Sequence, residues 1–82
     1  MDWDTVGFVK ASQIRVDILR KLDEKPMSPK ELKHELSIHF PQVSLTLKQM
    51  SEKNLIECLT SSCSKGKIYA ITSVGKQVLK EI

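Results

Sequence analysis

The residues around Ser28 restrict the fold more than any other part of this sequence. Ser28 precedes a proline, and Glu31 follows three positions after the serine. The serine can accept a hydrogen bond from the backbone three residues on while the glutamate bonds back, and a proline at the first helical position loses no hydrogen bond. The pattern predicts a short helix that begins at Pro29 and ends at Leu36.

An apolar repeat every four residues predicts a longer helix upstream of this one. Ser12 can cap its start. Pro26 ends it, because a proline restricts the residue before it and cannot continue a helix. Residues 1–10 form a short amphipathic lead to this helix. Its repeating apolar positions are Ile14, Ile18 and Leu22, with Leu19 alongside.

A third helix is predicted to open around Phe40 and Pro41, after a tight connection over residues 36–39. Its apolar residues share one face because they are spaced four and three apart; they are Val43, Leu47 and Met50. The rest of its surface is short-chained and hydrogen-bonding, unlike the Glu and Lys mixture of an ordinary solvated helix. The face opposite the apolar residues carries Pro41, Gln42, Leu45, Lys48, Gln49 and Glu52, with Ser44 and Thr46 on its flanks.

The pattern changes after the third helix. Residues 55–59 and 67–71 are short β-type runs, and the polar, glycine-containing segment 60–66 between them predicts a hairpin loop. Thr72 can cap a last helix over residues 73–82. We therefore predict a single, mostly helical α+β domain over residues 1–82, with a three-helix bundle, a two-stranded hairpin and a C-terminal helix.

Two short helices joined by a tight turn, with a hairpin directly after the second, form the winged helix-turn-helix arrangement. Its second helix lies in the major groove, where amides and hydroxyls read base edges and a glutamine can pair with adenine through two hydrogen bonds. The alternatives are a solvated face on a plain helical bundle, or a module that binds a protein partner. The predicted DNA-reading residues are Gln42, Ser44, Leu45, Thr46, Lys48 and Gln49.

Further DNA contacts are predicted outside the third helix. Ser28 caps a helix start whose free N–H groups can also meet a phosphate, although capping alone would account for the serine. Lys65 and Lys67 flank Gly66 near the hairpin tip and would straddle the DNA backbone or minor groove. The alternative is that these lysines only improve solubility.

The charge distribution favours a polyanionic partner. The chain of 82 residues has a net charge of +3, and all of this surplus comes from residues 37–82, where six basic residues face three acidic ones. A solvated lysine surface would show the same surplus, so the charge supports double-stranded DNA as a partner without deciding it.

Composition argues against several other classes of protein. A chain this short leaves little room for a water-excluding active site, and no Ser/His/Asp or paired-carboxylate arrangement stands out, so we expect no enzyme. No apolar run approaches the roughly 18–20 residues of a membrane span, and the start of the chain does not read as a signal peptide. We expect a soluble, cytoplasmic protein without a cofactor.

Three segments of the chain resemble the ArsR/MarR-type winged-helix regulators. Residues 36–57, LSIHFPQVSLTLKQMSEKNLIE, are similar to the family's turn, recognition helix and first wing strand. Residues 12–22, SQIRVDILRKL, resemble its Ser-x-x-Arg-x-x-Ile-Leu-x-x-Leu helix, and residues 67–76 resemble its Tyr-x-Leu-Thr-x-x-Gly-Lys junction. The three segments stand in the family's order. The resemblance implies a prokaryotic DNA-binding transcription regulator that acts by occupying a promoter region.

Three positions depart from the family's pattern. Ser37 and Asn54 stand where the family usually has glycine, and a positive φ at Ser37 would cost up to about 1 kcal/mol. Asparagine tolerates the left-handed conformation more easily. Leu45 stands where relatives often place a polar or basic residue, and it could touch a thymine methyl group or form the centre of a protein contact.

The cysteines and histidines do not make a metal site by spacing. Cys58 and Cys63 lie five residues apart, and His34 and His39 are the nearest other candidates. The spacing lacks the adjacent Cys-x-Cys type of pair that metal-sensing relatives carry, and nothing nearby completes four ligands. We therefore predict no metal, with a thiol redox switch as a minor alternative.

Apolar residues near the two ends of the chain exceed what one small domain readily covers. In one interpretation the N-terminal lead folds over the last helix within a single chain. In the other, which we favour, the first and last helices pair across a twofold axis to form a homodimer that spans two half-sites. The residues assigned to this interface are Trp3, Phe8, Val16, Val74, Val78 and Ile82.

Overall fold

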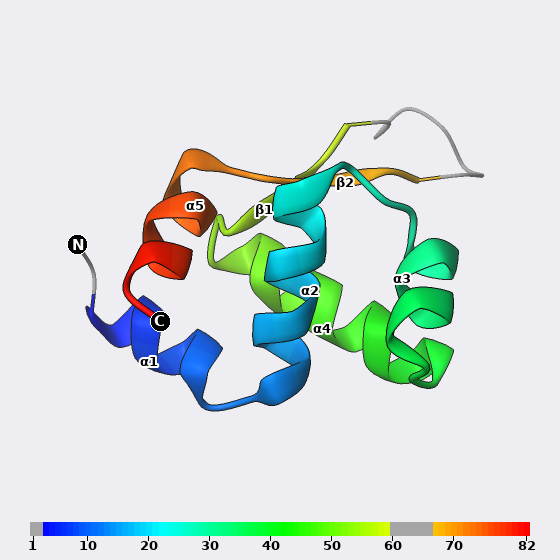
Figure 1. The fold of residues 1–82 in the computed structure, drawn as a ribbon, viewed down its shortest axis with the longest axis horizontal. Coiled ribbons are helices and arrows are strands. Elements are labelled where there is room, and N and C mark those ends of the chain that lie inside the picture. Colours follow the sequence, from blue (N-terminus) through cyan, green and yellow to red (C-terminus); the bar gives the residue numbers. More distant parts are fainter. Residues whose placement is uncertain (1–2, 60–66) are drawn as a thin grey trace.

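The protein was studied as a computed structural model that describes residues 3–59 and 67–82 (Figure 1). The predicted order of a helical bundle, a hairpin and a last helix is confirmed. One further helix lies at the start of the chain. The elements are α1 (Trp3–Lys10), α2 (Gln13–Glu24), α3 (Pro29–Leu36), α4 (Phe40–Glu52), β1 (Ile56–Cys58), β2 (Tyr69–Ile71) and α5 (Ser73–Lys80).

Helix α1 replaces the undefined lead that the sequence predicted. Val6 and Val9 are buried, and α1 contacts both α2 and α5. Figure 1 shows α1 and α5 at the same end of the molecule. The N-terminal segment therefore does fold over the last helix of its own chain. None of the described helices is long and apolar enough to cross a membrane.

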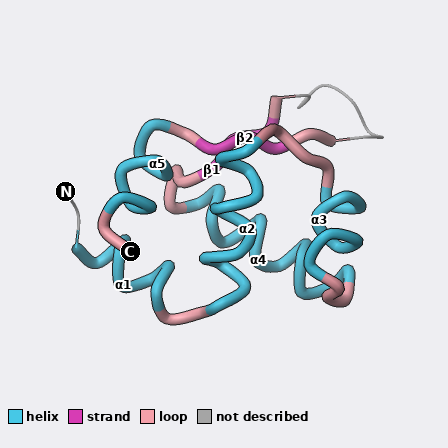
Figure 2. The backbone as a smooth tube through the Cα atoms, in the orientation of Figure 1, coloured by secondary structure: helices cyan, strands magenta, loops and turns pink. Residues whose placement is uncertain are grey.

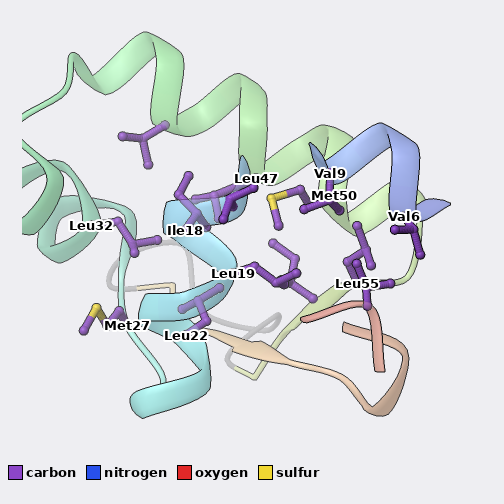
Figure 3. Packing of buried hydrophobic residues seen from close by; sticks show 14 residues of the cluster. Val6, Val9, Ile18, Leu19, Leu22, Met27, Leu32, Leu47, Met50 and Leu55 are labelled. Atoms are coloured by element: carbon purple, nitrogen blue, oxygen red, sulfur yellow. The ribbon is translucent and has the colours of Figure 1, made fainter. Parts of the chain in front are cut away.

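The core is centred on α2, which contacts every other helix and β2. Ile18, Leu19 and Leu22 of α2 are fully buried, and Leu47 and Met50 of α4 pack over them (Figure 3). Two residues that the sequence assigned to a dimer interface, Val16 and Val78, belong to this core. The complete buried cluster is Val6, Val9, Val16, Ile18, Leu19, Leu22, Met27, Leu32, Val43, Leu47, Met50, Leu55, Ile56 and Val78.

The predicted start of α3 is confirmed in atomic detail. The backbone N–H of Glu31 donates to Ser28 Oγ at 3.2 Å, and the backbone N–H of Ser28 donates to Glu31 Oε1 at 3.2 Å. Thr72 caps α5 as expected, since its Oγ1 accepts from the N–H of Gly75 at 3.2 Å. Ser12 precedes α2, but its side chain makes no cap hydrogen bond.

Both positions that depart from glycine in the family pattern adopt left-handed backbone. Ser37 has φ 54° and ψ 44°, and it closes the connection between α3 and α4. Asn54 has φ 60° and leads from α4 into β1. A non-glycine residue with left-handed φ and ψ has a conformational cost of roughly 1 kcal/mol. The cost is smaller for asparagine because its side chain tolerates this conformation.

The hairpin strands are shorter than predicted. Their antiparallel register pairs Ile56 with Ile71 and Cys58 with Tyr69. The connector between α2 and α3 joins this sheet, because Met27 and Tyr69 exchange backbone hydrogen bonds of 3.0 and 2.8 Å (Figure 2). This pairing, which the sequence did not indicate, fixes the start of α3 against the end of the sheet at which Tyr69 pairs with Cys58. Residues 60–66, the predicted loop, lie outside the described residues.

Candidate nucleic-acid interface

The outer face of α4 is the centre of the candidate interface. The helix follows α3 through the turn at Ser37 and turns its buried side toward the core. The residues left exposed on it include four of the predicted reading residues. These are Gln42, Ser44, Leu45 and Lys48.

Thr46 is not a reading residue in this structure. It is buried at 8% exposure, together with Val43 and Leu47. The reason is helical geometry: Thr46 lies three residues after Val43 and therefore only about 60° away around the helix. The core face of α4 is wide enough to include it, which an apolar pattern alone does not reveal.

Gln49 is half-buried, and its carboxamide is already engaged. Arg15 Nη2 donates to Gln49 Oε1 at 3.3 Å. Bidentate pairing with adenine requires the glutamine oxygen to accept from the base while the nitrogen donates. Because an amide oxygen has two lone pairs, Gln49 could pair with adenine by sharing this oxygen with Arg15, and its reading role stays a prediction.

Arg15 of α2 contacts residues of both α1 and α4. Its Nη1 donates to the main-chain oxygen of Phe8 at 2.6 Å, and its guanidinium carbon lies 3.8 Å from the centre of the Phe8 ring. Lys53, the residue directly after α4, also faces this ring, with its Nζ 5.5 Å from the ring centre. Phe8, which the sequence assigned to a dimer interface, is thus largely occupied within its own chain. The sequence carried one signal for Arg15, its match to the arginine of the family's helix pattern.

Basic side chains also gather around α3, where the sequence indicated no surplus of charge. An open cavity of about 750 Å³ is lined there by Lys25, Lys30 and Lys33, with His34 and His39. Both glutamates on its lining have partners: Glu31 completes the capping box and Glu35 lies 3.7 Å from Lys21. The net charge of residues 1–36 does not reveal this local excess of basic side chains, because acidic residues elsewhere in that range cancel it.

The remaining predicted DNA contacts are Ser28, Lys67 and Lys65. Ser28 is half-buried at the start of α3, where its hydroxyl serves the cap. Lys67 is exposed just before β2. Lys65 lies outside the described residues. Among residues 3–59 and 67–82, no cluster of three His, Cys, Asp or Glu side chains could hold a metal ion.

The apolar surface near the chain ends is smaller than the sequence suggested. Val16 and Val78 are buried in the core, because α1, α2 and α5 pack together within one chain. They therefore cannot form a surface seam, and that part of the prediction is wrong. The exposed members are Trp3 at 66%, Val74 at 42% and Ile82. We use the name terminal patch for these three exposed residues, which lie on α1, on α5 and just after α5.

Comparison with solved structures identifies proteins that share this fold. No family model and no curated protein matches this sequence. The adhesin competence repressor AdcR from Streptococcus pyogenes is similar with a TM-score of 0.77 and 15% identity, over 85% of this chain and 53% of its own. The transcriptional repressor BigR from Xylella fastidiosa is similar with a TM-score of 0.76 and 18% identity, over 98% of this chain and 75% of its own.

The heme sensor protein PefR, solved with heme and carbon monoxide, is similar with a TM-score of 0.64 and 27% identity, over 80% of this chain and 46% of its own. The chain thus spans about half the length of AdcR and PefR. AdcR and BigR are repressors and PefR is a heme sensor, and their similarity shows that this chain has the winged-helix fold that its sequence resemblance implied.

Proposed function

We propose that this chain, whose fold is that of the ArsR/MarR-type winged-helix regulators, is a transcriptional regulator that binds double-stranded DNA with sequence preference. The observation that carries the proposal is the exposed face of α4. The helix stands between a tight left-handed turn and a hairpin, and it presents Gln42, Ser44 and Lys48 outward. Hydroxyl and amide groups on such a helix are suited to base edges in the major groove.

The proposed mechanism is positional and involves no chemical step. With α4 in the major groove, Lys67, which is exposed just before β2, would meet the flanking backbone or minor groove, and we propose the same role for Lys65. Ser28 and the free N–H groups at the start of α3 would meet a phosphate. Lys30 and Lys33 on the exposed side of α3 would add phosphate contacts that the sequence did not suggest. Occupying a promoter region then changes the access of RNA polymerase.

We further propose that the regulator is a homodimer. The terminal patch is exposed on α1 and α5, at the end of the molecule away from α3 (Figure 1). A twofold pairing of this patch would place two recognition helices on one duplex. Two copies would also double the phosphate contacts, which matters because Lys48 is the only cation on the outer face of α4.

The direct test is binding of the purified chain to a fluorescent pool of random duplexes over a salt series. Binding should weaken steeply with salt, and Lys67→Ala should reduce the slope of log affinity against log salt by about one. Lys80→Ala, an exposed lysine at the end of α5, is the matched control and should leave the slope unchanged. Absence of duplex binding at about 50 mM salt, where phosphate contacts are strongest, would refute the proposal.

A second candidate function is a protein-binding module that uses the same helix. Phe40 at 48% exposure and Leu45 at 57% are large apolar side chains left open on α4. If duplex binding is absent, these two exposed side chains, on different sides of α4, favour a protein partner that contacts this helix.

A further inference from the structure

The centre of the outer face of α4 is apolar. Leu45 is 57% exposed, and Pro41 and Lys48 lie one turn before and after it on the same row of the helix. A leucine so exposed contributes no hydrogen bond to a base edge. Because Leu45 faces away from the buried side of α4, in a groove it would have to meet something apolar or leave polar groups of the base without partners.

Fewer polar readers surround Leu45 than the sequence predicted. Thr46 is buried in the core, and Gln49 Oε1 accepts from Arg15 at 3.3 Å. Ser44 and Gln42 remain exposed on either side. The contact made by Leu45 therefore carries a larger share of any base preference than it would on a helix with four free amides and hydroxyls.

Only one base offers an apolar group in the major groove. Thymine presents its C5 methyl group there, whereas the edges of the other bases consist of donors and acceptors. We propose that Leu45 is a specificity-determining residue that contacts the C5 methyl group of a thymine in the bound duplex. This inference rests on the DNA-binding function proposed above.

The surroundings of Leu45 favour DNA over a protein partner. Phe40 lies five residues earlier and therefore about 140° away around the helix, so the two apolar side chains do not form one stripe. Lys48 follows Leu45 by three residues, and Ser44 precedes it directly. A single leucine between a hydroxyl and a cation suits the mixed polar and methyl surface of a major groove better than an apolar protein surface.

Replacement of thymine by deoxyuridine tests the inference, because it removes only the methyl group. The parent chain is first used to select tight-binding duplexes from a randomised pool, and each thymine of a selected duplex is then replaced in turn. At one position in each half-site, the replacement should weaken binding by the parent by about threefold to tenfold, the effect of losing one buried methyl group.

Variants of the reading helix make the test specific. Leu45→Ala should bind the thymine and uracil duplexes about equally, while Leu45→Met should keep the preference for thymine. Gln42→Ala, the matched control on the same helix, should also keep it. Thermal unfolding of each variant confirms that these exposed substitutions leave the fold intact.

The possible outcomes distinguish a failure of the proposed Leu45 contact from a failure of the proposed DNA binding. If the parent binds selected duplexes but shows no uracil penalty, or the penalty persists in Leu45→Ala, the inference is overturned while DNA binding stands. If the parent binds no duplex from the pool, the proposed function fails and the inference fails with it.

Discussion

Arg15 Nη2 lies 3.3 Å from Gln49 Oε1, so α2 is joined to α4 through two side chains 34 positions apart in the sequence. The same guanidinium donates to the main-chain oxygen of Phe8 in α1 at 2.6 Å. One side chain thus joins the first helix, the central helix and the reading helix. The orientation of α4 depends in part on this connection.

The first prediction concerns the stability contributed by Arg15. Arg15→Ala should lower the free energy of unfolding by about 1.5–3 kcal/mol, because it removes a hydrogen bond from a charged donor and the contact over the Phe8 ring. Arg15→Lys should recover only part of this, since an ammonium group cannot reach both acceptors in a fixed fork. Urea unfolding followed by circular dichroism measures both values.

Arg20 provides the control for this experiment. It lies on the same helix but is exposed, and Arg20→Ala should change stability by no more than about 0.5 kcal/mol. Equal losses for Arg15→Ala and Arg20→Ala would show that the connection to α1 and α4 contributes nothing beyond surface charge.

The second prediction contrasts two helical glycines. A Cβ at Gly75 would collide with the main-chain oxygen of Leu55 and come within 2.6 Å of Ile71 Cγ1, while a Cβ at Gly7 would meet nothing within 4 Å. Gly75→Ala should therefore destabilise the protein by about 1–3 kcal/mol through overpacking. Gly7→Ala should stabilise it by about 0.5–1 kcal/mol because alanine loses less backbone freedom in a helix. Melting temperatures that change in the same direction for both variants would contradict this close approach of α5 to the sheet.

The third prediction separates the two roles of Ser28. Ser28→Ala removes the cap and should cost about 0.5–2 kcal/mol of stability. Ser28→Asp keeps a capping oxygen and adds a charge that the helix start favours, so stability should remain close to that of the parent. If Ser28 also meets a DNA phosphate, the aspartate should nevertheless weaken duplex binding, because the two anions repel. Unchanged duplex affinity in Ser28→Asp would limit Ser28 to its role as a cap.

Local signals in the sequence predicted most of the backbone but not the contacts between distant elements. The capping box at Ser28 was accurate because all its partners lie within three residues. The left-handed turn at Ser37 followed from the family's glycine pattern. The bond between Arg15 and Gln49, and the pairing of Met27 with Tyr69, join residues far apart in the chain. Periodicity carries no information about such pairs, which is why Gln49 was expected to be free. Thr46 was expected to be exposed for a different reason, because the apolar pattern does not show how wide the core face of α4 is.

The same limitation applies to the predicted dimer interface. An apolar residue near the chain end can face either the core or a partner, and the sequence does not distinguish the two. Val78 is fully buried, so Val78→Asp would place an unpaired carboxylate in the core and unfold the chain. A test of the interface must use the terminal patch instead.

The last prediction is that the terminal patch mediates a homodimer. Trp3 and Val74 are exposed on α1 and α5, and the molecule extends 34 Å along its longest axis. Two copies that meet at this end can hold their recognition helices at a separation near the roughly 34 Å of one duplex turn. Val74→Asp should yield a folded monomer, because a charge at an exposed position disturbs the partner contact but not the core. Glu57→Ala, an exposed change on the sheet, is the control and should remain dimeric. Sedimentation of the parent as a monomer across the micromolar range would refute the dimer and leave a single-half-site contact as the only mode of DNA binding.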